Sequence, residues 1–170
     1  MKKVIFDTNI YGNIAIEDTG FDIAKNLSKN NEIIIYGSDI IEEELQRVPE
    51  EKTLRGRKFK EIIHYLYYTI IKYRLKTSPL IDYLAEMYLE LYKDKIKKEK
   101  IKKDNWKNIL VDFRIVALAS LKNLDVVFSN DDRTMTSNLC IKIYKKINKE
   151  NSLRTPEFLN YLDLKKRWFQ

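Results

Sequence analysis

The sequence predicts an α/β fold in which helices pack around a parallel β-sheet. Short runs of apolar, β-favouring residues recur along the chain, as expected of strands that are buried on both faces of a parallel sheet. Helical patterns lie between these runs, and this alternation is typical of the α/β class. The predicted strands are Lys3–Phe6, Ile33–Tyr36, Val126–Phe128 and Ile141–Tyr144.

The predicted helices begin and end at recognisable signals. Ser38 is a good N-cap for the second helix, and Thr77-Ser78-Pro79 separates two long helices in the middle of the chain. Thr155-Pro156-Glu157 places proline in the first turn of a last helix that runs through Tyr161. The other predicted helices are Asp22–Lys29, Asp39–Val48, Arg55–Lys76, Leu80–Lys103 and Asn105–Lys122.

The 170 residues are most simply one domain, covering 1–170, because this length buries a core without disulfides. Proline and glycine are too scarce for a flexible linker. The segment between the second and third strands is longer than one crossover needs. We therefore expect residues 55–103 to form an inserted long helical hairpin.

Charge and cysteine content restrict the class of protein. The chain has 32 Lys and Arg against 25 Asp and Glu, a net charge of +7. This balance favours a polyanionic partner, nucleic acid before an acidic protein, although lysines that only cover solvated surfaces are the alternative. The single Cys140 excludes an internal disulfide, and the single His64 excludes a zinc site built from several histidines. With no apolar stretch of membrane-spanning length and no signal-type segment, we expect a cytoplasmic protein.

Four carboxylates lie where an ordinary fold has little use for them. Asp7 and Asp131 each follow an apolar run, and ligands of open parallel sheets bind beyond the carboxyl ends of the strands. Glu44 follows Ile40 and Ile41 by four and three residues, so it shares the apolar face of its predicted helix. Asp112 shares a helical face with apolar neighbours in the same way, whereas Arg114 points elsewhere.

A buried carboxylate without a partner costs several kcal/mol unless it takes a proton. A cation shared by several acids is the simplest compensation, and Mg²⁺ and Mn²⁺ prefer oxygen ligands. Each acid also has an ordinary alternative: Asp7 and Asp131 as turn formers, Glu44 and Asp112 as members of buried ion pairs. The short polar side chains that would orient the acids, or water bound near them, are Thr8, Asn9, Ser129 and Asn130.

Four segments resemble, in order, the motifs of PIN domains, the fold of many metal-dependent ribonucleases including VapC-type toxins. The first resembles a strand ending in Asp, the second a helix in which Glu precedes Leu, the third an Asp opening an Ala-rich helix, and the fourth a strand followed by Ser, Asn and Asp. The segments are Val4–Asn9, Ser38–Leu45, Asp112–Ala119 and Phe128–Asp132. The resemblance implies a three-layer α/β/α sandwich with a sheet of about four to five strands, and hydrolysis of RNA phosphodiesters.

The predicted function is therefore that of a ribonuclease dependent on Mg²⁺ or Mn²⁺. Asp7, Asp112 and Asp131 would be ligands, and Glu44 would be a ligand, directly or through water, or would help to deprotonate the attacking water. Asp132 would share or replace the role of Asp131. We expect single-stranded RNA to bind basic and aromatic residues of the central helices. For the tyrosines, a role in the core or in a dimer contact is the alternative. The residues are Lys60, Lys72, Arg74, Lys76, Tyr65, Tyr67, Tyr68 and Tyr73.

Two other functions stay open at this point. The first is a non-catalytic PIN-like subunit that binds nucleic acid, although a protein that only binds polyanions gains nothing from clustered acids. The second is a subunit that binds a partner protein, such as an antitoxin-like regulator, and this role is compatible with catalysis. Tyrosine-rich helix faces also leave a homodimer open.

Overall fold

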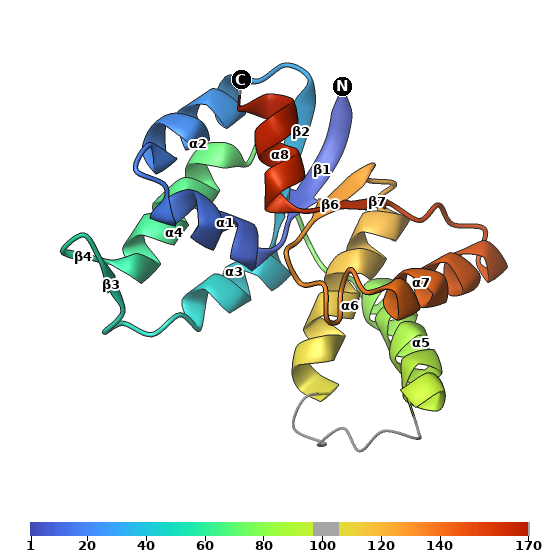
Figure 1. The fold of residues 1–170 in the computed structure, drawn as a ribbon. Helices are drawn as coiled ribbons and strands as arrows, with labels where there is room; N and C mark the ends of the chain where they lie inside the picture. Colours follow the sequence, from blue (N-terminus) through green and yellow to red (C-terminus); the bar gives the residue numbers. More distant parts are fainter. Residues whose placement is uncertain (97–105, 170) are drawn as a thin grey trace.

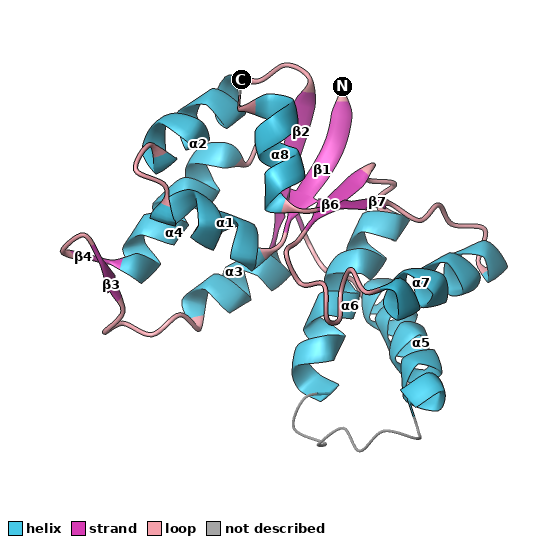
Figure 2. Ribbon diagram, viewed as in Figure 1, coloured by secondary structure: helices cyan, strands magenta, loops and turns pink. Residues whose placement is uncertain are grey.

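The computed structural model describes residues 1–96 and 106–169, and its centre is a five-stranded sheet in which every strand runs parallel to its neighbours. The strand order is β5-β2-β1-β6-β7 (Figure 2). Val4, Ile5 and Phe6 in β1 and all of β6 are fully buried, which confirms the prediction of strands covered on both faces. The strands are β1 (Lys2–Phe6), β2 (Ile33–Ser38), β5 (Tyr73–Leu75), β6 (Val126–Phe128) and β7 (Glu157–Leu159).

Helices cover both faces of this sheet, so the predicted three-layer α/β/α sandwich is confirmed (Figure 1). One face carries α1 (Thr8–Ile16), α2 (Gly20–Lys29) and α4 (Phe59–Ile70). The opposite face carries α5 (Pro79–Ile96), α6 (Trp106–Leu121) and α7 (Asn138–Glu150). Two shorter helices lie at the ends of strands: α3 (Asp39–Gln46) after β2 and α8 (Tyr161–Trp168) after β7.

The strand order reverses between β1 and β6. From β1 the chain moves outward to β2 and β5, then returns to β6 on the other side of β1 and continues to β7. Crossovers leave the two central strands in opposite directions, which opens a crevice beyond their carboxyl ends. Asp7 directly follows β1, and Asp131 follows β6 after Ser129 and Asn130. The two predicted strand-end acids therefore lie at this switch point.

The prediction of a strand at Ile141–Tyr144 is wrong, because these residues lie inside α7. The buried residues of α7 include Cys140, Ile143, Tyr144 and Ile147, which recur at the spacing of one helical face. Ser137 caps this helix by accepting a hydrogen bond from the Cys140 amide at 3.2 Å. The four-residue run Ile-Lys-Ile-Tyr is too short for its sequence pattern to distinguish a strand from one turn of a helix.

The predicted helical hairpin at residues 55–103 does not form within the described residues. The predicted helix Arg55–Lys76 is instead a small antiparallel hairpin of β3 (Thr53–Leu54) and β4 (Arg57–Lys58), then α4, then β5. Arg55 and Gly56 at the turn both have positive φ, which glycine adopts without strain. Because β5 joins the main sheet beside β2, α4 and α5 lie on opposite faces of the sandwich.

Other boundaries also differ from the prediction. The helix α1 follows Asp7 directly and was not predicted. Near the C-terminus the predicted helix through Tyr161 is strand β7, and α8 begins only after Asn160, which forms a capping box with Asp163. Helix α5 ends at Ile96, and the rest of the predicted Leu80–Lys103 helix lies outside the described residues. Among the described helices, none combines the length and the apolar character needed to cross a membrane.

Candidate functional site

Asp7 stands at the centre of the site, where β1 passes into α1. It is the N-cap of α1, and its side chain is only 4% exposed. Its carboxylate accepts hydrogen bonds from the Thr8 amide at 2.7 Å, from the Ser129 hydroxyl at 2.7 Å and from the Asn9 amide group. Burial nevertheless raises the pKa of Asp7, and the charge of Asp131 adds to this effect.

Asp131 belongs to the loop after β6 and is held by backbone amides. Its own amide donates to the Ser129 hydroxyl at 3.0 Å, and its carboxylate accepts from the amides of Arg133 and Thr134 at 3.1 and 3.0 Å. Burial alone would raise the pKa of Asp131, but hydrogen bonds from Thr134, Met135 and Arg133 outweigh it and hold that pKa below its usual range. Asp131 therefore stays ionised most readily of the four acids.

Glu44 reaches the site from α3. Ser38 caps this helix, so Ile40 and Ile41 turn into the core and Glu44 follows them on the same side. The Thr8 hydroxyl lies 3.3 Å from a carboxylate oxygen of both Glu44 and Asp7, and so links α3 to the end of β1. Burial, followed by the charge of Asp7, raises the pKa of Glu44 to about 7.

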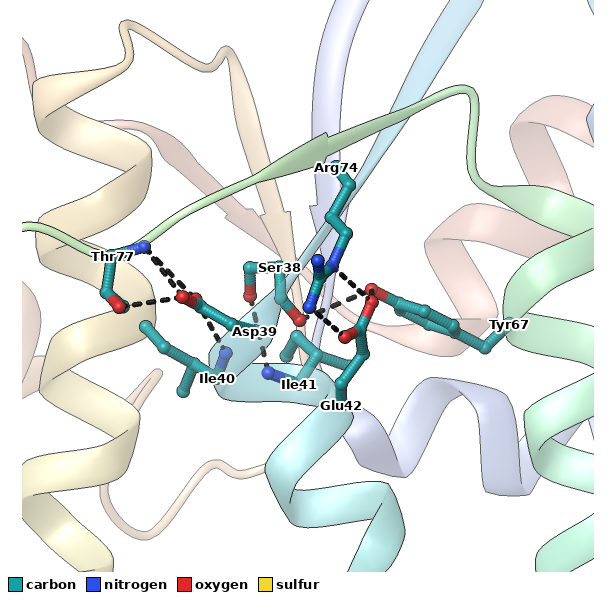
Figure 3. A network of polar contacts seen from close by, with 8 residues as sticks. All are labelled: Ser38, Asp39, Ile40, Ile41, Glu42, Tyr67, Arg74 and Thr77. Carbon is teal, nitrogen blue, oxygen red and sulfur yellow. Dashed lines mark hydrogen bonds and ion pairs between the residues drawn. The ribbon is translucent and has the colours of Figure 1, made fainter.

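The neighbouring acids of α3 have other partners (Figure 3). Glu42 forms an ion pair with Arg74 of β5 and accepts a hydrogen bond from the Tyr67 hydroxyl at 3.1 Å. Asp39 accepts from the amide and hydroxyl of Thr77 at 2.9 and 2.7 Å. These contacts fasten the first turn of α3 to α4, to β5 and to the segment after β5. Glu43 is exposed, as expected from its helical position.

Asp112 completes the group from the middle of α6, on the other face of the sheet. The Thr134 hydroxyl donates to its carboxylate at 3.2 Å. Burial, then the charges of Asp7, Asp131 and Glu44, raises the pKa of Asp112 to about 8. Arg114 does not relieve this charge, because its side chain pairs with Asp82 at 2.7 Å. Within the described residues neither Asp112 nor Glu44 forms an ion pair, so the alternative of a buried ion pair is not what the fold provides there.

The four acids thus lie in one electrostatic group without forming a closed cage. In the described part of the chain, no three side chains from His, Cys, Asp and Glu are close enough to form a ready metal-binding group. The donor chemistry fits a hard divalent cation, since all four groups offer carboxylate oxygens. Burial first, and then the charges of neighbouring carboxylates, raise the pKa values of Glu44 and Asp112 to about 7 and about 8.

The short polar residues after the strands tie the site together. Asn9 donates to the Ser129 hydroxyl at 3.1 Å and accepts from the Asn130 amide at 3.1 Å. The Asn130 side chain accepts from the Tyr161 amide at 2.9 Å, at the start of α8. Asp132 is exposed, whereas Asp131 makes the contacts within the site. Whether Asp132 shares the role of Asp131 stays a prediction.

Thr134 was not predicted, although it contacts both Asp131 and Asp112. An Asp followed by Thr three residues later is a common turn pattern, and this was the only sequence signal. Its contact with Asp112 depends on how α6 packs against the loop after β6, which the sequence does not display.

Several of the basic residues expected to bind RNA have partners within the protein. Lys60 pairs with Glu50 at 2.8 Å, Lys72 donates to the Asn30 carbonyl at 3.1 Å, and Arg74 pairs with Glu42. Tyr67 is fully buried, whereas the other predicted tyrosines are exposed: Tyr65, Tyr68 and Tyr73. The alternative of a core role therefore applies to Tyr67.

Comparison with known proteins supports the fold. No protein-family model matches the chain, and no curated protein matches its sequence. Among solved structures, a chain in the crystal structure of VapBC2 from Rickettsia felis, bound to a DNA fragment from their promoter, superposes with a TM-score of 0.52. The match covers 93% of this chain and 98% of the other, at 16% identity. At this identity the likeness shows a shared fold.

Proposed function

We propose that this protein is a metal-dependent ribonuclease that hydrolyses RNA phosphodiesters with the help of Mg²⁺ or Mn²⁺. One observation supports the proposal: acids from two strand ends and two helices, spread over Asp7 to Asp131, influence one another electrostatically near the switch point of the sheet. Burial, and then the charges of the three other acids, raises the pKa of Asp112 to about 8. A fold retains such repulsion at sites where a bound cation or a reaction makes use of it.

Asp7, Asp112 and Asp131 are the proposed metal ligands, and Glu44 is a fourth ligand or acts through water. A cation held by these residues would lower the pKa of a bound water molecule and offset charge that develops on the phosphate. Thr8 and Thr134 orient pairs of carboxylates, since each hydroxyl contacts two of them.

Glu44 is the residue best suited to take a proton from the attacking water. Its pKa of about 7 lies near neutral pH, where a general base works most efficiently. Asp131 is less suited to this role, because its hydrogen bonds hold its pKa low. The two acids therefore have different proposed roles, set by their surroundings.

RNA is the proposed substrate for three reasons. The chain has a net charge of +7, which favours a polyanion. Its four motifs resemble those of PIN-domain ribonucleases, and its fold is similar to that of a chain from a VapBC2 structure. We also propose an antitoxin-like protein partner or a homodimer, since large aromatic side chains are exposed on α2 and α4: Phe21, Tyr65 and Tyr68.

Cleavage of labelled single-stranded RNA tests the proposal. The wild type is expected to cut only with Mg²⁺ or Mn²⁺, and Asp7→Asn and Asp112→Asn are each expected to lose at least about 100-fold in rate. Asp132→Asn, an exposed acid next to the site, is the matched control and should cut normally. If the wild type neither cuts RNA nor is stabilised by metal, a non-catalytic subunit that binds nucleic acid or a partner protein becomes the better account.

A further inference from the structure

A pocket of about 280 Å³ lies between α1, α3 and α4, next to residues that contact Asp7 and Glu44. Thr8 and Asn9 belong to both sites: they line the pocket and also bind the carboxylate of Asp7. The pocket is smaller than most sites for drug-sized ligands and suits one small planar group. A chain whose phosphate lies at the acids would therefore place its next unit here.

The far wall of the pocket is aromatic and carries a cation. Phe59, which opens α4, is largely buried, and the Lys52 ammonium lies 4.2 Å from the centre of its ring. The Phe59 amide donates to the Lys52 carbonyl at 2.8 Å, so the two residues are fixed to one another through the backbone as well. Lys52 itself is exposed and its side chain has freedom to leave the ring.

Gly12 keeps the pocket open from the side of α1. A Cβ atom at this position would meet only the Phe59 ring, at 3.8 Å, which is an ordinary contact. The backbone of α1 therefore does not require glycine here, and glycine inside a helix is unfavourable relative to alanine. The residue is best explained by the space that a larger side chain would fill.

The polar groups of the pocket are already engaged. Both ends of the Asn9 amide group are in hydrogen bonds with residues of the site, and the Thr8 hydroxyl lies between Asp7 and Glu44. The remaining walls are mainly apolar, with Leu45 among them. Such a pocket selects its occupant by stacking and size, not by hydrogen bonds to base edges.

We propose that this pocket binds the unpaired nucleobase next to the phosphate that the acids cut. The base replaces Lys52 on the face of Phe59, and the freed ammonium pairs with a backbone phosphate. The Lys52 ammonium and a nucleobase would both contact the π-face of the Phe59 ring, so the base can take the place of the ammonium. The inference rests on the proposed ribonuclease function and adds a subsite that sets nucleotide preference.

Photo-crosslinking tests where the base lies. The probe is a short single-stranded RNA with one 5-iodouridine, bound to full-length Asp112→Asn protein, with the crosslinked residue mapped by mass spectrometry. We expect crosslinks at Phe59 or Lys52. Gly12→Leu should abolish them, and Phe59→Leu should weaken RNA binding by about tenfold. Tyr83→Leu and Lys146→Gln, an exposed aromatic residue and an exposed lysine outside the pocket, are the matched controls, and circular dichroism checks the fold of each variant.

Cleavage profiles of the otherwise wild-type protein separate the two proposals. Gly12→Leu is expected to change nucleotide preference beside the cut site by at least about fivefold. If the wild type cuts RNA but crosslinks map elsewhere and Gly12→Leu leaves the preference unchanged, the pocket proposal is overturned and the ribonuclease stands. Crosslinks at Phe59 without any cutting would support the pocket and overturn the ribonuclease. If neither occurs, both fall, and a side chain of a partner protein becomes the better occupant.

Discussion

The hydroxyl of Thr134 lies 3.2 Å from the carboxylate of Asp112, although the two residues are 22 positions apart in the sequence. The same hydroxyl is within hydrogen-bonding distance of Asp131. A hydroxyl has one hydrogen, so it donates to one of these carboxylates at a time. The contact brings a helix from one face of the sheet and a loop from the end of β6 to the same point.

Replacing Thr134 by valine removes this hydroxyl at nearly constant volume. Metal affinity or kcat is expected to fall by about 10- to 100-fold, the usual effect of removing a group that orients metal ligands. RNA cleavage measured against metal concentration checks it. Thr69→Val is the control, because the Thr69 hydroxyl bonds only the Tyr65 carbonyl of its own helix. Unchanged kinetics for Thr134→Val would show that the contact has no role in the site.

Removing the charge of Asp112 is expected to stabilise the protein in the absence of metal. Because burial and the neighbouring acids raise the pKa of Asp112 to about 8, its ionised carboxylate destabilises the folded protein at alkaline pH. Asp112→Asn should raise the free energy of unfolding by about 1–3 kcal/mol at pH 8.5, after allowance for solvent near a partly buried group. Urea unfolding with a chelator measures this change. The gain should shrink as the pH falls and become small only near pH 4, where the carboxyl of the unfolded wild type also takes up its proton, and Asp132→Asn should show no gain at either pH.

Stability without metal should fall as the pH rises from about 4 to 8. Burial and the neighbouring acids raise the folded-state pKa of Glu44 to about 7 and of Asp112 to about 8, above their ordinary values of 4.5 and 3.8. In this window the folded protein binds more protons than the unfolded chain, so raising the pH favours unfolding. Added Mn²⁺ should reverse the loss and stabilise more at pH 8 than at pH 5.5. Thermal melts that give equal metal stabilisation at both pH values would contradict this prediction.

Glu42 and Glu44 should separate stability from activity. Glu42→Gln breaks the ion pair with Arg74 and weakens the bond from Tyr67, so it should lower the free energy of unfolding while most RNA cleavage remains. Glu44→Gln should abolish cleavage and leave the free energy of unfolding equal to or above that of the wild type. Urea unfolding and cleavage rates of the two variants give the comparison. Equal losses of activity would remove the distinction between the two acids.

The sequence predicted the centre of the sheet well because its signal is local. The runs ending at Phe6 and Phe128 are apolar at every position, and burial on both faces produces that pattern. Glu44 was separated from Glu42 and Glu43 by helical spacing alone, and their exposures and partners agree with this choice. Whether the four acids bind metal stays a prediction.

The edges of the sheet could not be predicted in the same way. Tyr73–Leu75 and Glu157–Leu159 are three-residue strands with exposed or half-buried residues, and their pairing with β2 and β6 is set by tertiary contacts. Because strand β5 was not recognised, the two long helical patterns on either side of it were predicted to form a helical hairpin. Thr134 was missed for a similar reason, since its contact with Asp112 joins distant segments.

Binding of Mn²⁺ to the full-length protein tests the central claim, that acids from two strand ends and two helices form one cation site. Titration calorimetry at pH 8 would compare the wild type with asparagine or glutamine at each of the four acids, and with Asp132→Asn. The account predicts binding by the wild type and by Asp132→Asn, and affinity at least about tenfold weaker for each change at Asp7, Glu44, Asp112 and Asp131. Binding that survives all four substitutions, or no binding by the wild type, would contradict it.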